Sequence, residues 1–211
     1  KAFVVPTIRS TGPDHLDKVL VSHTDNDHAG GVQSLLTRYK SGPVVGLDQQ
    51  CENGRRWQWD GVEFLLVVDH RHSNKNDRSC TLLISNEQTS AYLSGDIGQK
   101  AEAGLLARLP RDIDFLLAPH HGSGGSSSYR FTRYLSPRWV VYSAGNANQY
   151  GHPHKRTLGR YELEGAAQVS TAQQGALRWC SSRPQQILSQ RHGDLLWEKF
   201  AGQDLLGAPN D

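Results

Sequence analysis

The chain contains no methionine, only three cysteines and no long hydrophobic run. Its longest apolar stretches, such as FLLVV at 64–68, are far shorter than the ~20 residues of a membrane-spanning helix, so we expect no direct membrane insertion by this segment. No stretch has the charged start, apolar middle and small-residue cleavage site of a signal peptide. Because the chain starts at KAFVVPTIRS without an initiating methionine, we expect it to be a piece of a longer protein.

The cysteines stand at positions 51, 80 and 180 and lack the CxxC spacing of a thiolate zinc site. One disulfide among them would fit an oxidising compartment, and the sequence leaves its pairing open. The 211 residues are 36% hydrophobic and 21% charged, which is ordinary for a soluble globular protein. The formal net charge of +2 is mildly basic and compatible with a polyanionic partner.

Apolar patterning alternates between strand-like and helical segments, which indicates an α/β layered domain. Strands are predicted at 18–22, 43–47, 61–69, 79–85, 90–96, 112–119 and 138–145. Helices are predicted at 32–40, 99–109, 126–135 and 154–165, with serines 126–128 as N-caps and Gly165 as a stop. The segments 167–172 and 175–181 predict a final hairpin. We expect the domain to span 1–198 and the end, 199–211, to be a flexible tail.

The stretch SHTDNDHAGG at 22–31 places four good metal ligands directly after a predicted strand. His23 and Asp25 are two positions apart and point the same way while the chain is extended. Asp27 and His28 stand at the turn into the next helix and can face the same cavity from another side. Capping a helix needs one carboxylate rather than two histidines and two aspartates, so this pattern favours a metal site over a simple capping turn.

Three further loops with polar side chains follow predicted strands. Asp96 ends a strand in LSGD, and His120 and His121 end the next one in APHHG. NQYGHPH at 148–154 offers Asn148, Tyr150 and His152 as further candidates. Because α/β proteins bind ligands at the carboxyl ends of their strands, we expect these loops to share one site.

In combination, these motifs resemble the metallo-β-lactamase superfamily over most of the chain, and more narrowly the C-terminal domain of ComEC competence proteins. The resemblance implies an αββα sandwich with metals held at the loop ends of its sheets. The family's domain opens with strands that carry a DVGQGDA-like segment, which does not precede KAFVVPTIRS, so we expect the first strands to be missing. The stretches that carry the resemblance are SHTDNDHAGG, NDRSCTLLI (76–84), LSGDIG (93–98), APHHGSGGSSS (118–128), NQYGHPH and GAL (175–177).

The resemblance also implies a biological role. The parent would be an integral membrane protein with a channel for transforming DNA. This domain would lie on the periplasmic, or extracytoplasmic, face of the bacterial cytoplasmic membrane. Its partners would be one strand of the incoming DNA duplex, which it degrades while the other strand is imported, and the channel part of the same protein.

Two departures from the superfamily pattern affect the choice of metal. The usual second histidine is Asp25 here, and the usual histidine of the third motif has no clear counterpart in the loop 69–79. ComEC-like domains share both departures. Because a carboxylate in place of an imidazole makes the site harder, the preference moves from zinc toward manganese or magnesium.

We therefore predict two divalent metal ions, manganese preferred, with zinc or magnesium as alternatives. His23, Asp25 and Asp96 would hold one ion, and Asp96 would bridge to the other. Two such ions, roughly 3.5–4 Å apart, can clamp a phosphodiester and share a hydroxide nucleophile. His121 is preferred to His120 as a ligand because it directly precedes the glycine turn. The full set of predicted metal ligands is His23, Asp25, Asp27, His28, Asp96 and His121.

Catalytic and substrate-binding roles follow from the same loops. Asp27 would orient the attacking water, and His120 or His152 would protonate the leaving oxygen. Backbone N–H groups of the loop at Ser123 suit a phosphate oxygen, and an aromatic ring can stack on a base. The predicted substrate-binding residues are Ser123, Lys75, Arg78, Asn148 and Tyr150.

The primary hypothesis is a metal-dependent nuclease acting on DNA. The same ligand set is compatible with hydrolysis of small esters, lactones or other phosphodiesters, because one fold supports several chemistries. A third hypothesis is a DNA-binding domain whose catalytic site is impaired.

Overall fold

A computed structural model describes residues 14–46, 51–189 and 195–197 of the chain. The predicted tail at 199–211 and the predicted domain boundary at 198 lie outside these residues. Within the described part, every helix is too short and too polar to cross a bilayer.

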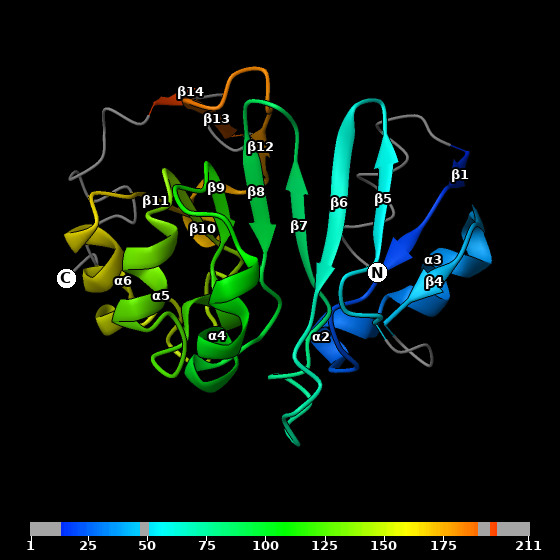
Figure 1. Cartoon of the computed structure of the whole chain (residues 1–211), viewed down its shortest axis with the longest axis horizontal. Helices are drawn as coiled ribbons and strands as arrows, with labels where there is room; N and C mark the ends of the chain where they lie inside the picture. Colours follow the sequence, from blue (N-terminus) through cyan, green and yellow to red (C-terminus); the bar gives the residue numbers. More distant parts are fainter. Residues whose placement is uncertain (1–13, 47–50, 190–194, 198–211) are drawn as a thin grey trace.

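A seven-stranded sheet, in the order β11-β10-β9-β8-β7-β6-β5, forms the centre of the fold (Figure 1). Neighbours from β5 to β8 are antiparallel, and neighbours from β8 to β11 are parallel. The parallel strands therefore bring their carboxyl ends to one edge, where the predicted site loops emerge. The strands are β5 (Arg56–Trp59), β6 (Val62–Val67), β7 (Thr81–Ser85), β8 (Ser90–Leu93), β9 (Phe115–Leu117), β10 (Trp139–Tyr142) and β11 (Ala167–Ser170).

Three helices cover one face of this sheet: α4 (Gln99–Leu105), α5 (Tyr129–Leu135) and α6 (Lys155–Leu163), with the short 3-10 helix η1 (Leu106–Arg108) after α4 (Figure 1). Their apolar sides pack on side chains from β6 to β10 in the largest core cluster. Tyr92, Phe131 and Leu116 are fully buried there. Burial of large side chains of this kind contributes roughly 1.5–3 kcal/mol each.

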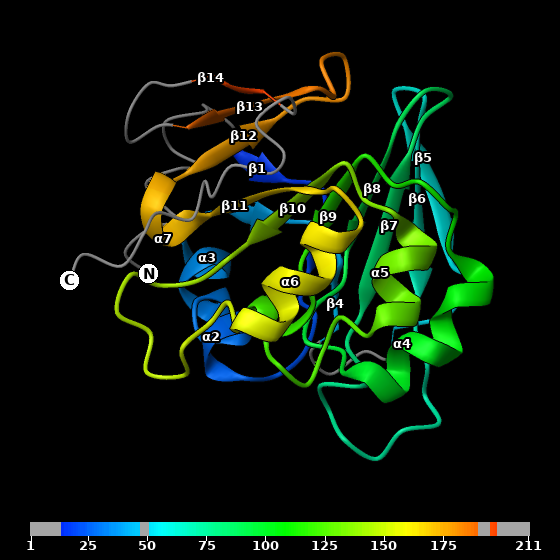
Figure 2. The same cartoon turned by 90° about the vertical axis from the view of Figure 1, so that its left-hand side faces the viewer.

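The opposite face is covered by small sheets. The parallel pair β2 (Val19–Leu20) and β4 (Val44–Val45) packs over β6 and β7, and β12 (Leu177–Trp179) and β13 (Gln186–Ser189) pack over β9 to β11. β14 (Leu195–Trp197) completes a three-stranded sheet above α7 (Figure 2). The remaining elements on this side are β1 (His15–Leu16), α2 (Asn26–Ala29), α3 (Val32–Arg38), β3 (Lys40–Ser41) and α7 (Thr171–Gln174). The layering is that of an αββα sandwich, as predicted.

Most predicted elements are confirmed, but the final hairpin is wrong. The segment 167–172 instead supplies β11, which pairs in parallel with β10. The chain then enters α7, where Ser170 Oγ accepts a hydrogen bond from Ala172 N, and β12 pairs with β13 in a separate sheet. Two apolar segments joined by QQG resemble a hairpin locally, but Ala167 and Val169 bury themselves against Trp139 and Val141, which lie far away in sequence.

Candidate metal centre

Four of the predicted ligands converge at the carboxyl edge of the sheet. Ligand atoms of Asp27, His28, Asp96 and His121 all lie within 4.8 Å of one another. Asp96 follows β8 and His121 follows β9, whereas Asp27 and His28 stand on α2 on the opposite layer. His28 Nε2 is 3.2 Å from Asp96 Oδ1, and His121 Nε2 is 3.3 Å from Asp27 Oδ2. The site thus joins the two layers of the fold.

The first motif is not a capping turn. Asp25 occupies the N-cap position of α2, but its side chain makes no cap hydrogen bond. Its carboxylate instead lies 3.3 Å from His23 Nε2. Gly30 is required for close approach, because a Cβ there would stand 2.3 Å from Asn26 Oδ1. The Asp25 carboxylate therefore points toward His23 and the site and does not cap the helix.

Neighbouring groups orient the imidazoles of the cluster. The carbonyl of Ser143 lies 2.8 Å from His121 Nδ1 and can only accept, so Nδ1 carries the proton and Nε2 presents a lone pair. The Ser22 hydroxyl lies 2.8 Å from His28 Nδ1 and holds that ring in place, as either donor or acceptor. The two Nε2 atoms then face each other at 3.2 Å. One of these two atoms can donate a hydrogen bond to the other, and both can bind a divalent metal when they carry no proton, so the residues fit such an ion.

The burial of His23, at the edge of the cluster, also supports a metal site. His23 is buried, and its Nε2 has no hydrogen-bond partner. A buried polar atom without a partner is costly, and metal coordination is one way to satisfy it. His23 Nε2 lies 3.7 Å from Asp96 Oδ2, so the ring points toward the cluster without belonging to it.

Electrostatics shift the pKa values of the two central groups of the cluster in opposite directions. Burial disfavours the charged form of His28, but the hydrogen bond and charge of Asp96 outweigh it, and the pKa of His28 is raised. Burial of Asp96 acts to raise its pKa, but His28, His121 and His120 together lower it. Asp96 therefore remains a carboxylate across the physiological range. Burial lowers the pKa of His23, so this ring is neutral and free to bind a cation.

The turn that carries His120 and His121 is held by a network that sequence reasoning missed. Both histidines have positive φ, at 50° and 55°, within η2 (Pro119–Gly122). Buried Glu102 on α4 accepts hydrogen bonds from the backbone N–H groups of Ser127 and Ser128. Arg160 on α6 donates to the carbonyls of Ser126 and Ser127 at 2.9 and 3.0 Å. The Gly/Ser-rich loop is therefore anchored and is not a linker. A glutamate on the apolar side of the 99–109 helix is the sequence signal for this network.

Other predicted residues surround the cluster at different distances. His120 is partly exposed, with Nε2 3.7 Å from Asp96 Oδ2. The Lys75 ammonium contacts Asp25 Oδ1 and lowers the pKa of that carboxyl. Arg78 is exposed farther along the same loop. Ser123 braces the turn, because its carbonyl accepts a hydrogen bond from the Thr157 hydroxyl.

A cleft of about 740 Å³ opens beside the cluster, with Asp27 and His121 among its lining residues. Asn148, Tyr150 and His152 form one wall, and α7 and the segment after it form another. Asn148 fixes the loop, donating to the carbonyl of His152 and accepting from its N–H. Tyr150 is 72% exposed and stacks on His152. Ser123, Arg78 and Lys75 are not among the residues that line this cleft. Sequence analysis did not predict the wall formed by α7, because it assigned the segments 167–172 and 175–181 to a hairpin.

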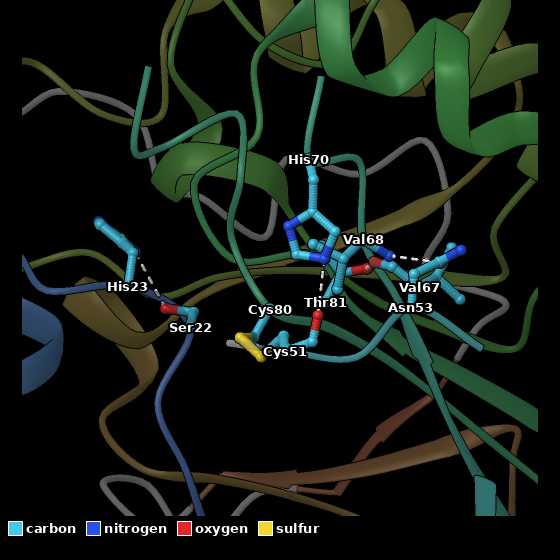
Figure 3. Close-up of a disulfide and its surroundings, with 9 residues drawn as sticks. All are labelled: Ser22, His23, Cys51, Asn53, Val67, Val68, His70, Cys80 and Thr81. Atoms are coloured by element: carbon cyan, nitrogen blue, oxygen red, sulfur yellow. Dashed lines mark hydrogen bonds between the residues drawn. A yellow bond between two sulfur atoms is a disulfide. The ribbon is translucent and has the colours of Figure 1, made fainter. Parts of the chain in front are cut away.

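A disulfide stands directly behind the first motif. Cys51 is bonded to Cys80, and Cys180 is exposed and free. Cys80 N donates to the carbonyl of Ser22 at 2.7 Å. His70 Nε2 donates to the carbonyl of Cys51, also at 2.7 Å (Figure 3). The bond therefore braces the end of β2, the point from which His23 extends toward the site.

The layered α/β fold and the His/Asp cluster at the strand ends are features of a class of metal-binding α/β sandwich proteins. Comparison with family models gives the same class. The model described as the metallo-beta-lactamase superfamily matches residues 5–145, and the chain belongs to this superfamily. Its fold is that of the superfamily's metal-dependent hydrolases, and this fold implies divalent metal ions.

Curated relatives narrow the resemblance. Competence protein ComA of Neisseria gonorrhoeae is 34% identical over 185 residues, which cover 83% of this chain and 27% of that protein. Recombination protein 2 of Haemophilus influenzae is 31% identical over 174 residues, which cover 77% of this chain and 22% of that protein. These two, and ComE operon protein 3 of Bacillus subtilis, are ComEC family proteins. The chain spans about a quarter of the length of these relatives.

Among solved structures, CmlA, a diiron beta-hydroxylase from Streptomyces venezuelae, matches with a TM-score of 0.52 and 13% identity. The match covers 75% of this chain and 44% of that chain. At this identity the likeness concerns the fold alone.

Proposed function

We propose that this domain is a metal-dependent nuclease that cleaves DNA phosphodiester bonds, with manganese as its preferred metal. The observation that carries the proposal is the convergence of two carboxylates and two imidazoles, Asp27, Asp96, His28 and His121, beside an open cleft. Oxygen-rich sites suit harder ions than zinc. When bound, a divalent ion at this cluster would supply Lewis-acid polarisation of the phosphate and a hydroxide nucleophile.

The chain's own residues divide the remaining work. Asp27 is 63% exposed at its side chain and lies at the mouth of the cleft, where its carboxylate can orient the attacking water. Burial lowers the pKa of His152, which is thus neutral near pH 7. We assign the donation of a proton to the leaving oxygen to His120, which is partly exposed with its Nε2 3.7 Å from Asp96 Oδ2, and His152 lies beside it at a ring distance of 6.0 Å.

The exposed ring of Tyr150 supports DNA as the substrate. It stands on a wall fixed by Asn148 and is free to stack on an unpaired base, which aromatic platforms do without sequence preference. The names of the relatives, two competence or recombination proteins, point in the same direction. We propose that the cleaved DNA is the strand that is not imported during natural transformation.

The proposed location follows from the relatives and from the disulfide. The chain matches only part of longer competence proteins, so we propose that a membrane channel belongs to the same parent protein. Disulfides persist in oxidising compartments, and the Cys51–Cys80 bond supports a position on the periplasmic, or extracytoplasmic, side.

Substitution of the carboxylates in the cluster tests the proposal. Asp96→Ala and Asp27→Ala should each reduce manganese-dependent cleavage of single-stranded DNA by about a thousandfold or more, because several kcal/mol of charge stabilisation are lost. Glu87→Ala is the matched control, since Glu87 lies in the turn at the other end of β8. Product release is measured on labelled single- and double-stranded oligonucleotides and on a chromogenic ester.

Each alternative function has its own signature in the same assay. Turnover of the ester with none of DNA would establish a small-substrate hydrolase. DNA binding without turnover of either substrate would establish an impaired binding domain. Cleavage that survives both aspartate substitutions would refute the proposed site.

A further inference from the structure

The two halves of the predicted dinuclear site differ in the structure. One half is the four-ligand cluster of Asp27, His28, Asp96 and His121. In the other half, His23 and Asp25 remain outside that cluster. Asp25 Oδ2 lies 3.3 Å from His23 Nε2, and Asp25 Oδ1 is in contact with the Lys75 ammonium. A cation of the chain thus already contacts the carboxylate that would define a second metal position.

The loop that carries Lys75 is anchored to the site on both sides. The Lys75 carbonyl accepts from Arg78 N at 3.2 Å, which closes a turn. Asp77 Oδ1 accepts from Gly98 N at 2.8 Å, and Ser79 Oγ accepts from Asp96 N at 3.1 Å. The same loop therefore positions both the ammonium of Lys75 and the backbone of the central ligand.

The formal charges of the site favour one divalent ion together with the Lys75 ammonium over two divalent ions. Three carboxylates, those of Asp25, Asp27 and Asp96, face four histidines. One divalent ion and the Lys75 ammonium neutralise these carboxylates formally, whereas a second divalent ion would leave an excess positive charge beside the ammonium. Like charges a few ångströms apart in a partly buried site oppose each other strongly.

We propose that this domain holds a single divalent ion, at the four-ligand cluster, and that Lys75 is the tethered cation in the place of a second ion. A lysine ammonium is a compact point charge with three donors, and it can pass from Asp25 to a non-bridging phosphate oxygen when DNA binds. Only this last role rests on the proposed nuclease function. The number of ions does not.

Manganese titration of the metal-free full chain tests the number of ions without any substrate. Free manganese is quantified by its electron paramagnetic resonance signal. The wild-type chain should bind one ion, and Lys75→Met, which removes the charge but keeps the length, should bind two. The second ion should bind at least about a hundredfold more tightly in Lys75→Met than in the wild type, because the repulsion is gone.

Two matched variants show whether the effect comes from Lys75 and Asp25. Arg78→Met removes a neighbouring cation of the same loop and should still bind one ion. The double variant Lys75→Met with Asp25→Asn should return from two ions to one. Lys75→Arg keeps the charge and should bind one ion, and circular dichroism shows that each variant is folded.

Two ions in the wild-type chain would overturn the proposal, and so would a single ion in folded Lys75→Met. Failure of the nuclease proposal looks different, because it would leave the number of ions unchanged and abolish only DNA cleavage. In cleavage assays, Lys75→Met should lower the rate on DNA and Lys75→Arg should restore part of it.

Discussion

The two faces of the seven-stranded sheet are stabilised in different ways. The helical face, under α4, α5 and α6, holds a large apolar core in which Tyr92, Phe131 and Leu135 are fully buried. On the opposite face, the part that carries residues 14–46, here called the disulfide face, has two-residue strands, a smaller apolar cluster and the Cys51–Cys80 bond, whereas β12 and β13 pack on a separate cluster over β9 to β11. Apolar packing maintains the first face, whereas a covalent bond supports the second.

The metal cluster takes two ligands from each side of this division. Asp27 and His28 stand on the disulfide face, and Asp96 and His121 stand on loops anchored by the helical face. A metal bound by all four ligands links a well-packed layer to a thinly packed one. We therefore expect the geometry of the disulfide face to limit metal affinity, and the helical face to limit overall stability.

Loss of the disulfide should have the largest effect on this balance. In the variant Cys51→Ala with Cys80→Ala, the free energy of unfolding should fall by ~3–4 kcal/mol, since the bond closes a loop with a sequence separation of 29 residues. Manganese affinity should fall as well, because Cys80 N anchors the carbonyl of Ser22, next to His23. Chemical unfolding and manganese titration measure the two effects.

The control for the disulfide is Cys180→Ser, which removes the exposed free thiol and should change neither quantity. If the double variant keeps its manganese affinity while losing stability, the disulfide face does not depend on the bond for its geometry. The inferred difference, that apolar packing maintains the helical face and a covalent bond supports the disulfide face, would then be wrong.

Acid should weaken metal binding through His28. Its pKa is raised above the ordinary 6.5, so protons compete for its Nε2 at a higher pH than for an unperturbed histidine. Affinity should be complete above the raised pKa and fall by up to about tenfold for each pH unit below it. Asp96, whose pKa is lowered, stays ionised through this range.

Calorimetric titration of manganese from pH 8 to pH 5.5 measures this dependence. The variant His15→Gln, which changes an exposed histidine of β1, should follow the wild-type curve. A manganese affinity that stays constant across the range would show that His28 is not a ligand.

The smallest effect is expected on the helical face. Ser128 Oγ caps α5 by accepting from Phe131 N at 3.3 Å, so Ser128→Ala should lower the free energy of unfolding by about 1 kcal/mol. Manganese affinity should not change, because Glu102 still holds the backbone of the loop. Ser128→Asp, another good cap, should restore the stability. A loss of manganese affinity in Ser128→Ala would remove the distinction between the two faces.

Local signals in the sequence were sufficient for most of the secondary structure. The apolar spacing at 32–40 predicts α3, and Val32 and Leu35 are indeed buried. The serine run at 126–128, which begins the predicted 126–135 helix, contains the cap of α5, Ser128. Helix periodicity and capping depend on residues only a few positions apart, which is why such patterns can be read from one sequence.

Contacts between distant residues were not predictable in the same way. The β12–β13 pairing was missed, because β13 finds its partner through Ile187 packing on Trp139 and Val169. The short β2 and β4 were predicted as longer strands, but only two residues of each reach a partner strand. Trp57 stacks on Phe64 within the β5–β6 hairpin, a contact with a residue on the neighbouring strand.

The sequence by itself determined the types of ligand and their positions after strands, because a motif such as HTDNDH and the strand before it are local. It also indicated the superfamily, through several short motifs in one order. Only the tertiary structure decided that Asp27, His28, Asp96 and His121 converge, that Cys51 pairs with Cys80, and that Lys75 contacts Asp25. Apart from the neighbours Asp27 and His28, these contacts join side chains 25 to 94 positions apart, and packing of the two layers decides them.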